Sequence, residues 1–135
     1  MKRTKLFFLG VFVALSNFAI AQYKLEIKLN NLSSKNGQIK LSLYDANQNS
    51  VMSRTVTLEN NECTIFLENV EAGKYALSYY HDENLNDKLD KNLLGIPKEG
   101  YGFSNNAYGM YGPEPFENWL FEIKDNTRIE LITKY

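Results

Sequence analysis

The sequence predicts an all-β domain built as a seven-stranded antiparallel β-sandwich. Apolar and polar residues alternate through most of 23–80, turn-forming residues separate these runs, and no stretch shows a sustained helical period with capping residues. Seven short strands with one apolar face each suit two sheets packed face to face. Segment 81–118 lacks the alternation, and we expect it to be one long ordered loop inserted in the sandwich.

Five of the expected strands precede the long segment. The first three cover 23–29, 39–43 and 52–58. Asn60-Asn61 is a hairpin signal, because asparagine tolerates positive φ, and it introduces the fourth strand. The fourth strand covers 63–67, the fifth 75–79, and the last two 119–123 and 129–131.

The first 21 residues predict a cleaved signal peptide. Three basic residues open the chain, an apolar run follows over 6–15, and small residues at positions 19 and 21 permit cleavage before Gln22. A membrane anchor is the alternative, but a span needs roughly 20 apolar residues and this run is shorter. Residues 22–135 then form a single domain, periplasmic or extracellular, with no stable membrane insertion after cleavage.

The charge of the chain excludes some partners. The full sequence has 15 basic and 16 acidic residues, and cleavage removes three basic ones, which leaves a net charge of −4 on residues 22–135. A mildly acidic surface argues against binding to nucleic acid or to anionic lipid.

The single cysteine, Cys63, excludes an intrachain disulfide. It alternates with Ile65 and Leu67, so we expect a buried hydrophobic residue here. A reactive thiol is the alternative, although no partner histidine or cysteine lies nearby in the sequence.

A glycine turn at Gly73 leads directly into a strand that begins with Tyr75. This arrangement resembles immunoglobulin-like and transthyretin-like sandwiches, in which the tyrosine hydroxyl bonds back across the corner. An ordinary core tyrosine explains the pattern equally well. Under both interpretations Tyr75 serves folding.

The long segment has the composition of an ordered loop. It contains all three prolines, five of the eight glycines and several aromatic residues. Disordered segments are poor in aromatic residues, and loops longer than roughly 15 residues are usually functional or disordered. We therefore expect a rigid, folded-back loop that caps one end of the sandwich.

Four oxygen-bearing side chains near the start of this loop have the spacing of calcium ligands. They occupy positions 1, 3, 5 and 9 of a calcium-binding loop: Asp82, Asn84, Asn86 and Asp90. Position 6 is Asp87 instead of glycine, and position 12 is Leu93 instead of glutamate. In the alternative, the same side chains bond neighbouring backbone amides and need no ion.

Seven further residues are candidates for a binding surface. They are His81, Glu99, Tyr101, Asn105, Asn106, Tyr108 and Tyr111. Tyrosine beside asparagine and aspartate suits glycan binding by stacking and hydrogen bonds, and the alternative is that these rings fasten the loop to the sheet. His81 is the only histidine, so zinc has little support. Hydrolysis through His81 with Ser104, or through loop carboxylates, is a further alternative.

Four stretches of the sequence carry a resemblance to a known family. They are HDENLNDKLDKN (81–92), GIPKEGYGFSNN (95–106), the earlier Gly73-x-Tyr75-Ala76 and the later GPEPF (112–116). The chain resembles an uncharacterised family of exported bacterial proteins, the domain of unknown function number 2141. Asp87 departs from this pattern, where glycine is expected. The resemblance implies export and a small β domain, and it implies no activity, substrate or catalytic residues.

The sequence therefore favours an exported, non-enzymatic binding or accessory module of the bacterial cell envelope. Segment 81–118 is the expected recognition surface, with calcium as one option for its organisation, and the partner is an unknown envelope protein or glycan. A hydrolase acting on polysaccharide or peptide through His81 and loop carboxylates is the first alternative. A purely structural domain is the second.

Overall fold

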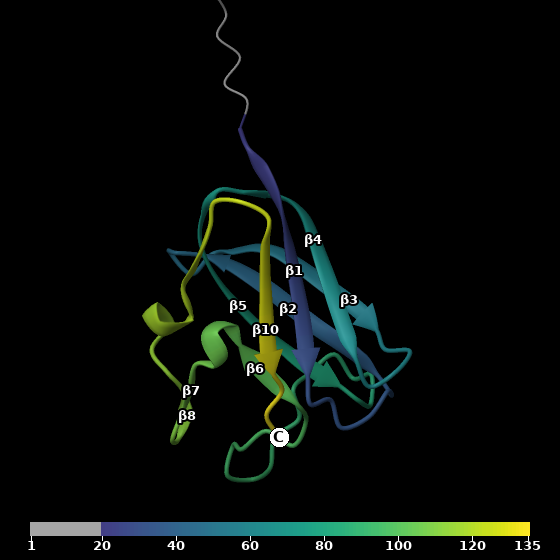
Figure 1. Cartoon of the computed structure of the whole chain (residues 1–135). Coiled ribbons are helices and arrows are strands. Elements are labelled where there is room, and N and C mark those ends of the chain that lie inside the picture. The colour runs from purple at the N-terminus through teal and green to yellow at the C-terminus, as the bar shows by residue number, and fades with distance from the viewer. Residues whose placement is uncertain (1–19) are drawn as a thin grey trace, which may run out of the picture.

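The computed structural model describes residues 20–135, which form ten strands and two short 3-10 turns (Figure 1). The five long strands that come first are β1 (Gln22–Asn30), β2 (Gln38–Asp45), β3 (Ser50–Thr57), β4 (Cys63–Glu71) and β5 (Gly73–Asp82). Then come β6 (Tyr101–Phe103), η1 (Ser104–Asn106), β7 (Tyr108–Gly109), β8 (Gly112–Pro113), η2 (Phe116–Trp119), β9 (Phe121–Ile123) and β10 (Thr127–Ile132).

The strands form two main layers, which Figure 1 shows one in front of the other. The first sheet has the order β10-β1-β4, the second has the order β3-β2-β5-β6 with β9 also paired to β5, and β7 and β8 form a small hairpin. The all-β prediction with two sheets is confirmed.

Two details of the predicted sandwich differ from the structure. Strands β1 and β10 run parallel, with Ile27 opposite Ile129, whereas every other pair of described strands is antiparallel. Alternation reports which face of a strand is buried and not which strand lies beside it, so it does not reveal this pair. The three extra strands, β6 to β8, have two or three residues, too few to show a period.

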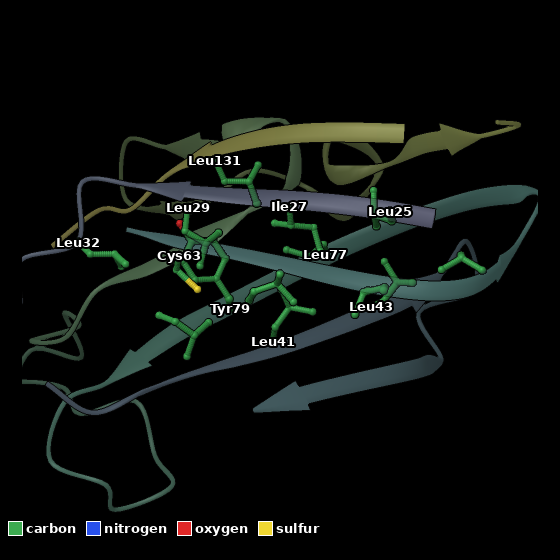
Figure 2. Close-up of a cluster of buried hydrophobic side chains, with 14 of the residues drawn as sticks. Leu25, Ile27, Leu29, Leu32, Leu41, Leu43, Cys63, Leu77, Tyr79 and Leu131 are labelled. Atoms are coloured by element: carbon green, nitrogen blue, oxygen red, sulfur yellow. The ribbon is translucent and has the colours of Figure 1, made fainter. Parts of the chain in front are cut away.

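The hydrophobic core lies between the two sheets (Figure 2). Alternate residues of β1, β2, β5 and β10 supply fully buried side chains, including Leu25, Ile27, Leu43, Leu77 and Leu131. Strand β3 contributes less than its sequence predicts, because it is an edge strand whose Met52 and Val56 are only partly buried. This core fixes the five-stranded sheet from which segment 81–118 departs.

The corner before β5 has the expected hydrogen bond. The hydroxyl of Tyr75 donates to the backbone oxygen of Glu71 over 3.0 Å, across Gly73. The bond ties the end of β4 to the start of β5, which agrees with the expectation that Tyr75 serves folding.

Cys63 is buried, as predicted, and burial raises the pKa of its thiol to about 11. Only about one thiol in a thousand is then ionised at pH 8, and the thiolate is the reactive form. We expect iodoacetamide at pH 8 to alkylate the native protein far more slowly than the protein unfolded in guanidinium. Equal rates, followed by mass spectrometry, would contradict the burial of this side chain.

Residues 1–19, which carry most of the predicted signal peptide, lie outside the described part of the chain. Across residues 20–135, no helix reaches the length and apolar character needed to cross a membrane.

Candidate functional site

Segment 81–118 lies at one end of the sandwich, beside the C-terminus (Figure 1). It leaves the sheet at the end of β5, forms the loop 83–100, and returns as β6, which pairs with β5 again. The hairpin β7–β8 follows, and η2 leads into β9. Both ends of the insertion are therefore anchored in the same five-stranded sheet.

The base of the loop is built around His81, which is fully buried. Its Nε2 atom lies 2.6 Å from the backbone oxygen of Asn36, and its Nδ1 atom lies 3.2 Å from the hydroxyl of Tyr135. A carboxylate oxygen of Glu83 lies 3.7 Å from Nδ1. Both ring nitrogens thus have protein partners, and the imidazole joins three separate segments of the chain.

Two buried carboxylates hold the backbone of the loop. Asp82 accepts hydrogen bonds from the amides of Asn86 and Asp87 at 3.0 and 2.9 Å. Glu99, only 5% exposed, accepts from the amides of Glu83 and Asp90, both at 2.9 Å. Because an ionised acceptor strengthens a hydrogen bond, these four bonds close the loop firmly.

The tip of the loop is tied to β2 by an ion pair. The Nζ atom of Lys40 lies 2.5 Å from a carboxylate oxygen of Asp87. The hydrogen bond to Asp87 is the main reason that the pKa of Lys40 is raised. This contact is solvent-exposed, so the buried carboxylates contribute more to the order of the loop.

The structure brings three of the four predicted calcium ligands together, namely Asn84, Asn86 and Asp90. The side-chain amides of Asn84 and Asn86 donate to the two carboxylate oxygens of Asp90 at 2.6 and 3.0 Å. Asp87, at position 6, has a φ of 61°, the left-handed conformation for which calcium loops use glycine.

The same contacts also fit the ion-free alternative. The side-chain oxygens of Asn84 and Asn86 accept backbone amides two residues ahead. Within residues 20–135, no three histidine, cysteine, aspartate or glutamate side chains gather closely enough to hold a metal. Calcium binding therefore stays a prediction.

That prediction has a direct test. A cation that binds only the folded protein adds about 2.7 kcal/mol to its free energy of unfolding when the ion is at 100 times its Kd. The melting temperature rises as a result. If calcium organises the loop, 1 mM calcium will raise Tm relative to EDTA, and Asp90→Asn will abolish the shift. Equal Tm values in calcium and EDTA would leave the loop held by its hydrogen bonds alone.

Three residues of the predicted binding surface fasten the segment to its neighbours. The side-chain amide of Asn105 donates to the backbone oxygens of Asn118 and Leu120. The side-chain oxygen of Asn106 accepts a hydrogen bond from the amide of Ile132 at 2.8 Å, and the hydroxyl of Tyr108 donates to the backbone oxygen of Ile132. These contacts cover part of the outer edge of β10, a usual protection for an edge strand.

Ser104 has a structural role that the sequence did not reveal. It is fully buried, donates to the backbone oxygen of Trp119 at 2.6 Å, and accepts the amide of Leu77 at 2.9 Å. One side chain therefore joins β5, η1 and η2. A serine between Phe103 and two asparagines gives no sequence signal for this role.

Aromatic rings form a continuous layer that includes Tyr108 of the hairpin. Tyr101 and Tyr108 pack edge-on, with ring centroids 5.9 Å apart, and Phe103 lies 4.3 Å from Trp119. Burial raises the pKa of Tyr108 to about 12. Most of the predicted binding-surface residues therefore stabilise the segment.

An apolar groove lies between loop residues 89–97 and the β7–β8 hairpin. Its volume is about 660 Å³, and Tyr101 and Tyr111 are the members of the predicted surface that line it. Its walls also carry large exposed apolar side chains: Leu94 (84% exposed), Ile96 (56%) and Met110 (86%), beside Tyr111 (98%). Sequence reasoning missed the groove, although leucine, isoleucine and methionine in a turn-rich segment were the available signal.

Comparison of the chain with known protein families identifies the family to which it belongs. The model of a family described as an uncharacterized protein conserved in bacteria (DUF2141) matches residues 27–130. The chain belongs to this family. The match confirms the resemblance carried by the loop motif, and it covers both sheets and the whole of segment 81–118. No curated protein and no solved structure matches the chain.

Proposed function

We propose that the protein is an exported, non-enzymatic binding or accessory module of the bacterial cell envelope. Its recognition surface is the groove between residues 89–97 and the β7–β8 hairpin, within segment 81–118. The observation that carries this proposal is the exposure of Leu94, Ile96, Met110 and Tyr111 around one hollow. Contiguous exposed apolar side chains mark interaction sites on soluble proteins.

The anchoring of both walls supports recognition. Residues 89–97 are held by Glu99 and by Asn92, which accepts the amides of Leu94 and Ile96 at 2.9 and 3.0 Å. The hairpin is fixed through its own Tyr108, whose ring packs against Tyr101 and whose hydroxyl donates to the backbone oxygen of Ile132. A surface fixed before binding loses less entropy when a partner arrives.

The surroundings of the titratable groups favour binding over hydrolysis. A general base must come within about 3 Å of the proton that it removes. His81, Asp82 and Glu99 are buried and are occupied by protein partners. A hydrolase that uses His81 and loop carboxylates would need these groups at a surface.

Export and the finer fold assignment are part of the same proposal. The basic start, short apolar run and small residues before Gln22 support a cleaved signal peptide. An immunoglobulin-like or transthyretin-like sandwich is supported by the two packed sheets and by the hydrogen bond from Tyr75 to Glu71.

Site-specific photo-crosslinking in cells tests the recognition surface. A benzophenone amino acid at Met110 is expected to give a discrete adduct that Tyr111→Ser weakens without changing Tm. The matched control is the same probe at Val51, an exposed apolar residue of β3 that does not line the groove. Equal labelling from both positions, or no adduct from Met110, would contradict the proposal.

A further inference from the structure

The groove has a charge that the rest of the protein does not share. Its lining includes two lysines, Lys91 and Lys134, and no aspartate or glutamate. The whole chain has one more acidic than basic residue. The groove is therefore a locally cationic, apolar surface on a mildly acidic protein.

Both lysines are available to a ligand. Among residues 20–135, neither Lys91 nor Lys134 lies within 4.0 Å of a carboxylate. The Nζ atom of Lys134 lies 5.4 Å from the ring centre of Tyr108, a contact that leaves its three hydrogen-bond donors largely free. Apolar surroundings strengthen the attraction of such a cation for a carboxylate.

The backbone of both walls is also accessible. Gly95, Gly109 and Gly112 line the groove, and no atom lies within 4 Å of the place where a side chain would begin at Gly95 or Gly112. The amide of Gly95 already donates to the backbone oxygen of Asn92, and Gly109 pairs with Gly112 within the hairpin, so these glycines allow close approach of a ligand rather than offer hydrogen bonds.

We propose that the groove binds a short extended peptide that carries both large apolar side chains and carboxylates. The apolar side chains pack against Leu94, Ile96, Met110 and Tyr111. The carboxylates pair with Lys91 and Lys134. This inference rests on the proposed recognition function and specifies its partner as a segment of another protein.

Two further features favour a peptide of this kind. Methionine is adaptable and is common at surfaces that bind peptides, and tyrosine supplies a large contact area with little conformational entropy. The volume of the groove, about 660 Å³, falls within the range of about 300–1,000 Å³ that is typical of ligand pockets.

Panning a phage-displayed random heptapeptide library on the purified protein tests the inference. We expect enriched sequences that combine leucine, phenylalanine or tryptophan with aspartate or glutamate. A synthetic peptide of the commonest sequence should bind at least tenfold more weakly to Lys134→Glu and to Tyr111→Ser. The matched control Lys124→Glu, which alters an exposed lysine between β9 and β10, should leave the Kd unchanged.

Three outcomes overturn the peptide assignment. Enriched peptides without acidic residues would contradict it, and so would binding that is indifferent to Lys134→Glu and Tyr111→Ser. Binding of sodium oleate in the groove, without peptide enrichment, would assign a lipid carboxylate instead and leave the recognition surface standing. The recognition surface itself is tested separately, by the crosslinking from Met110.

Discussion

Replacing Gly37 by alanine is expected to destabilise the protein by more than about 3 kcal/mol. Gly37 has a φ of +82°, and a side chain at this position would begin 2.1 Å from the backbone oxygen of Asp82 and 2.6 Å from Cα of Glu83. These atoms belong to the backbone at the end of β5 and cannot turn aside as a flexible side chain could. The connection between β1 and β2 would have to move away from the base of the loop.

Gly95→Ala is the matched control for this substitution. Gly95 has a similar φ of +79°, but no atom lies within 4 Å of the place where its side chain would begin. Only the cost of the left-handed conformation remains there, about 1–2 kcal/mol. Urea denaturation followed by tryptophan fluorescence measures both values. Equal losses for the two variants would mean that the close approach of Gly37 to Asp82 does not exist.

Glu99→Ala is expected to cost about 2–4 kcal/mol, because it removes the acceptor of two backbone amides. Those amides belong to Glu83 and Asp90, on opposite sides of the loop. The loss should be concentrated in residues 83–98, since the strands themselves keep their contacts. Urea denaturation gives the total, and amide exchange at Asn86 and Asp87 gives the local part.

Two further variants define the cause of that loss. Glu99→Gln keeps the shape and one acceptor oxygen, so it is expected to lose about half as much stability as Glu99→Ala. Glu117→Ala changes a glutamate of η2 whose side chain is exposed, and it should stay within about 0.5 kcal/mol of the unmodified protein. If Glu99→Ala behaved like Glu117→Ala, the carboxylate of Glu99 would not hold the loop.

The main strands could be predicted because their sequence signal has a simple physical cause. Leu25, Ile27 and Leu29 alternate because a strand with one buried face needs an apolar residue at every second position. The partner of each strand could not be predicted in this way. The parallel pairing of β1 with β10 depends on the chain crossing between the two sheets after β9, which no local pattern encodes.

The candidate site also has one part that the sequence could predict and one part that it could not. The spacing of Asp82, Asn84, Asn86 and Asp90 predicted side chains that meet, and three of them do so at the carboxylate of Asp90. Their meeting is local in sequence, so spacing can reveal it. The groove is different, because Leu94 and Met110 face one hollow only through the folding of two separate loops.

Burial of polar residues was the hardest property to read from the sequence. His81 and Glu99 were expected on a binding surface, since glutamate is mostly exposed and histidine is intermediate in burial. They are buried here because their partners are backbone groups: the oxygen of Asn36 for His81, and the amides of Glu83 and Asp90 for Glu99. Backbone partners leave no trace in residue identity.

Amide hydrogen exchange across residues 81–118 tests most directly whether this segment is held in place to present a groove. The amides of Glu83, Asn86, Asp87 and Asp90 donate to buried carboxylates, so they should exchange on the order of a hundredfold more slowly than in an unstructured peptide. Exchange at the rate of a free peptide throughout 81–118 would contradict an ordered segment and remove the proposed recognition surface.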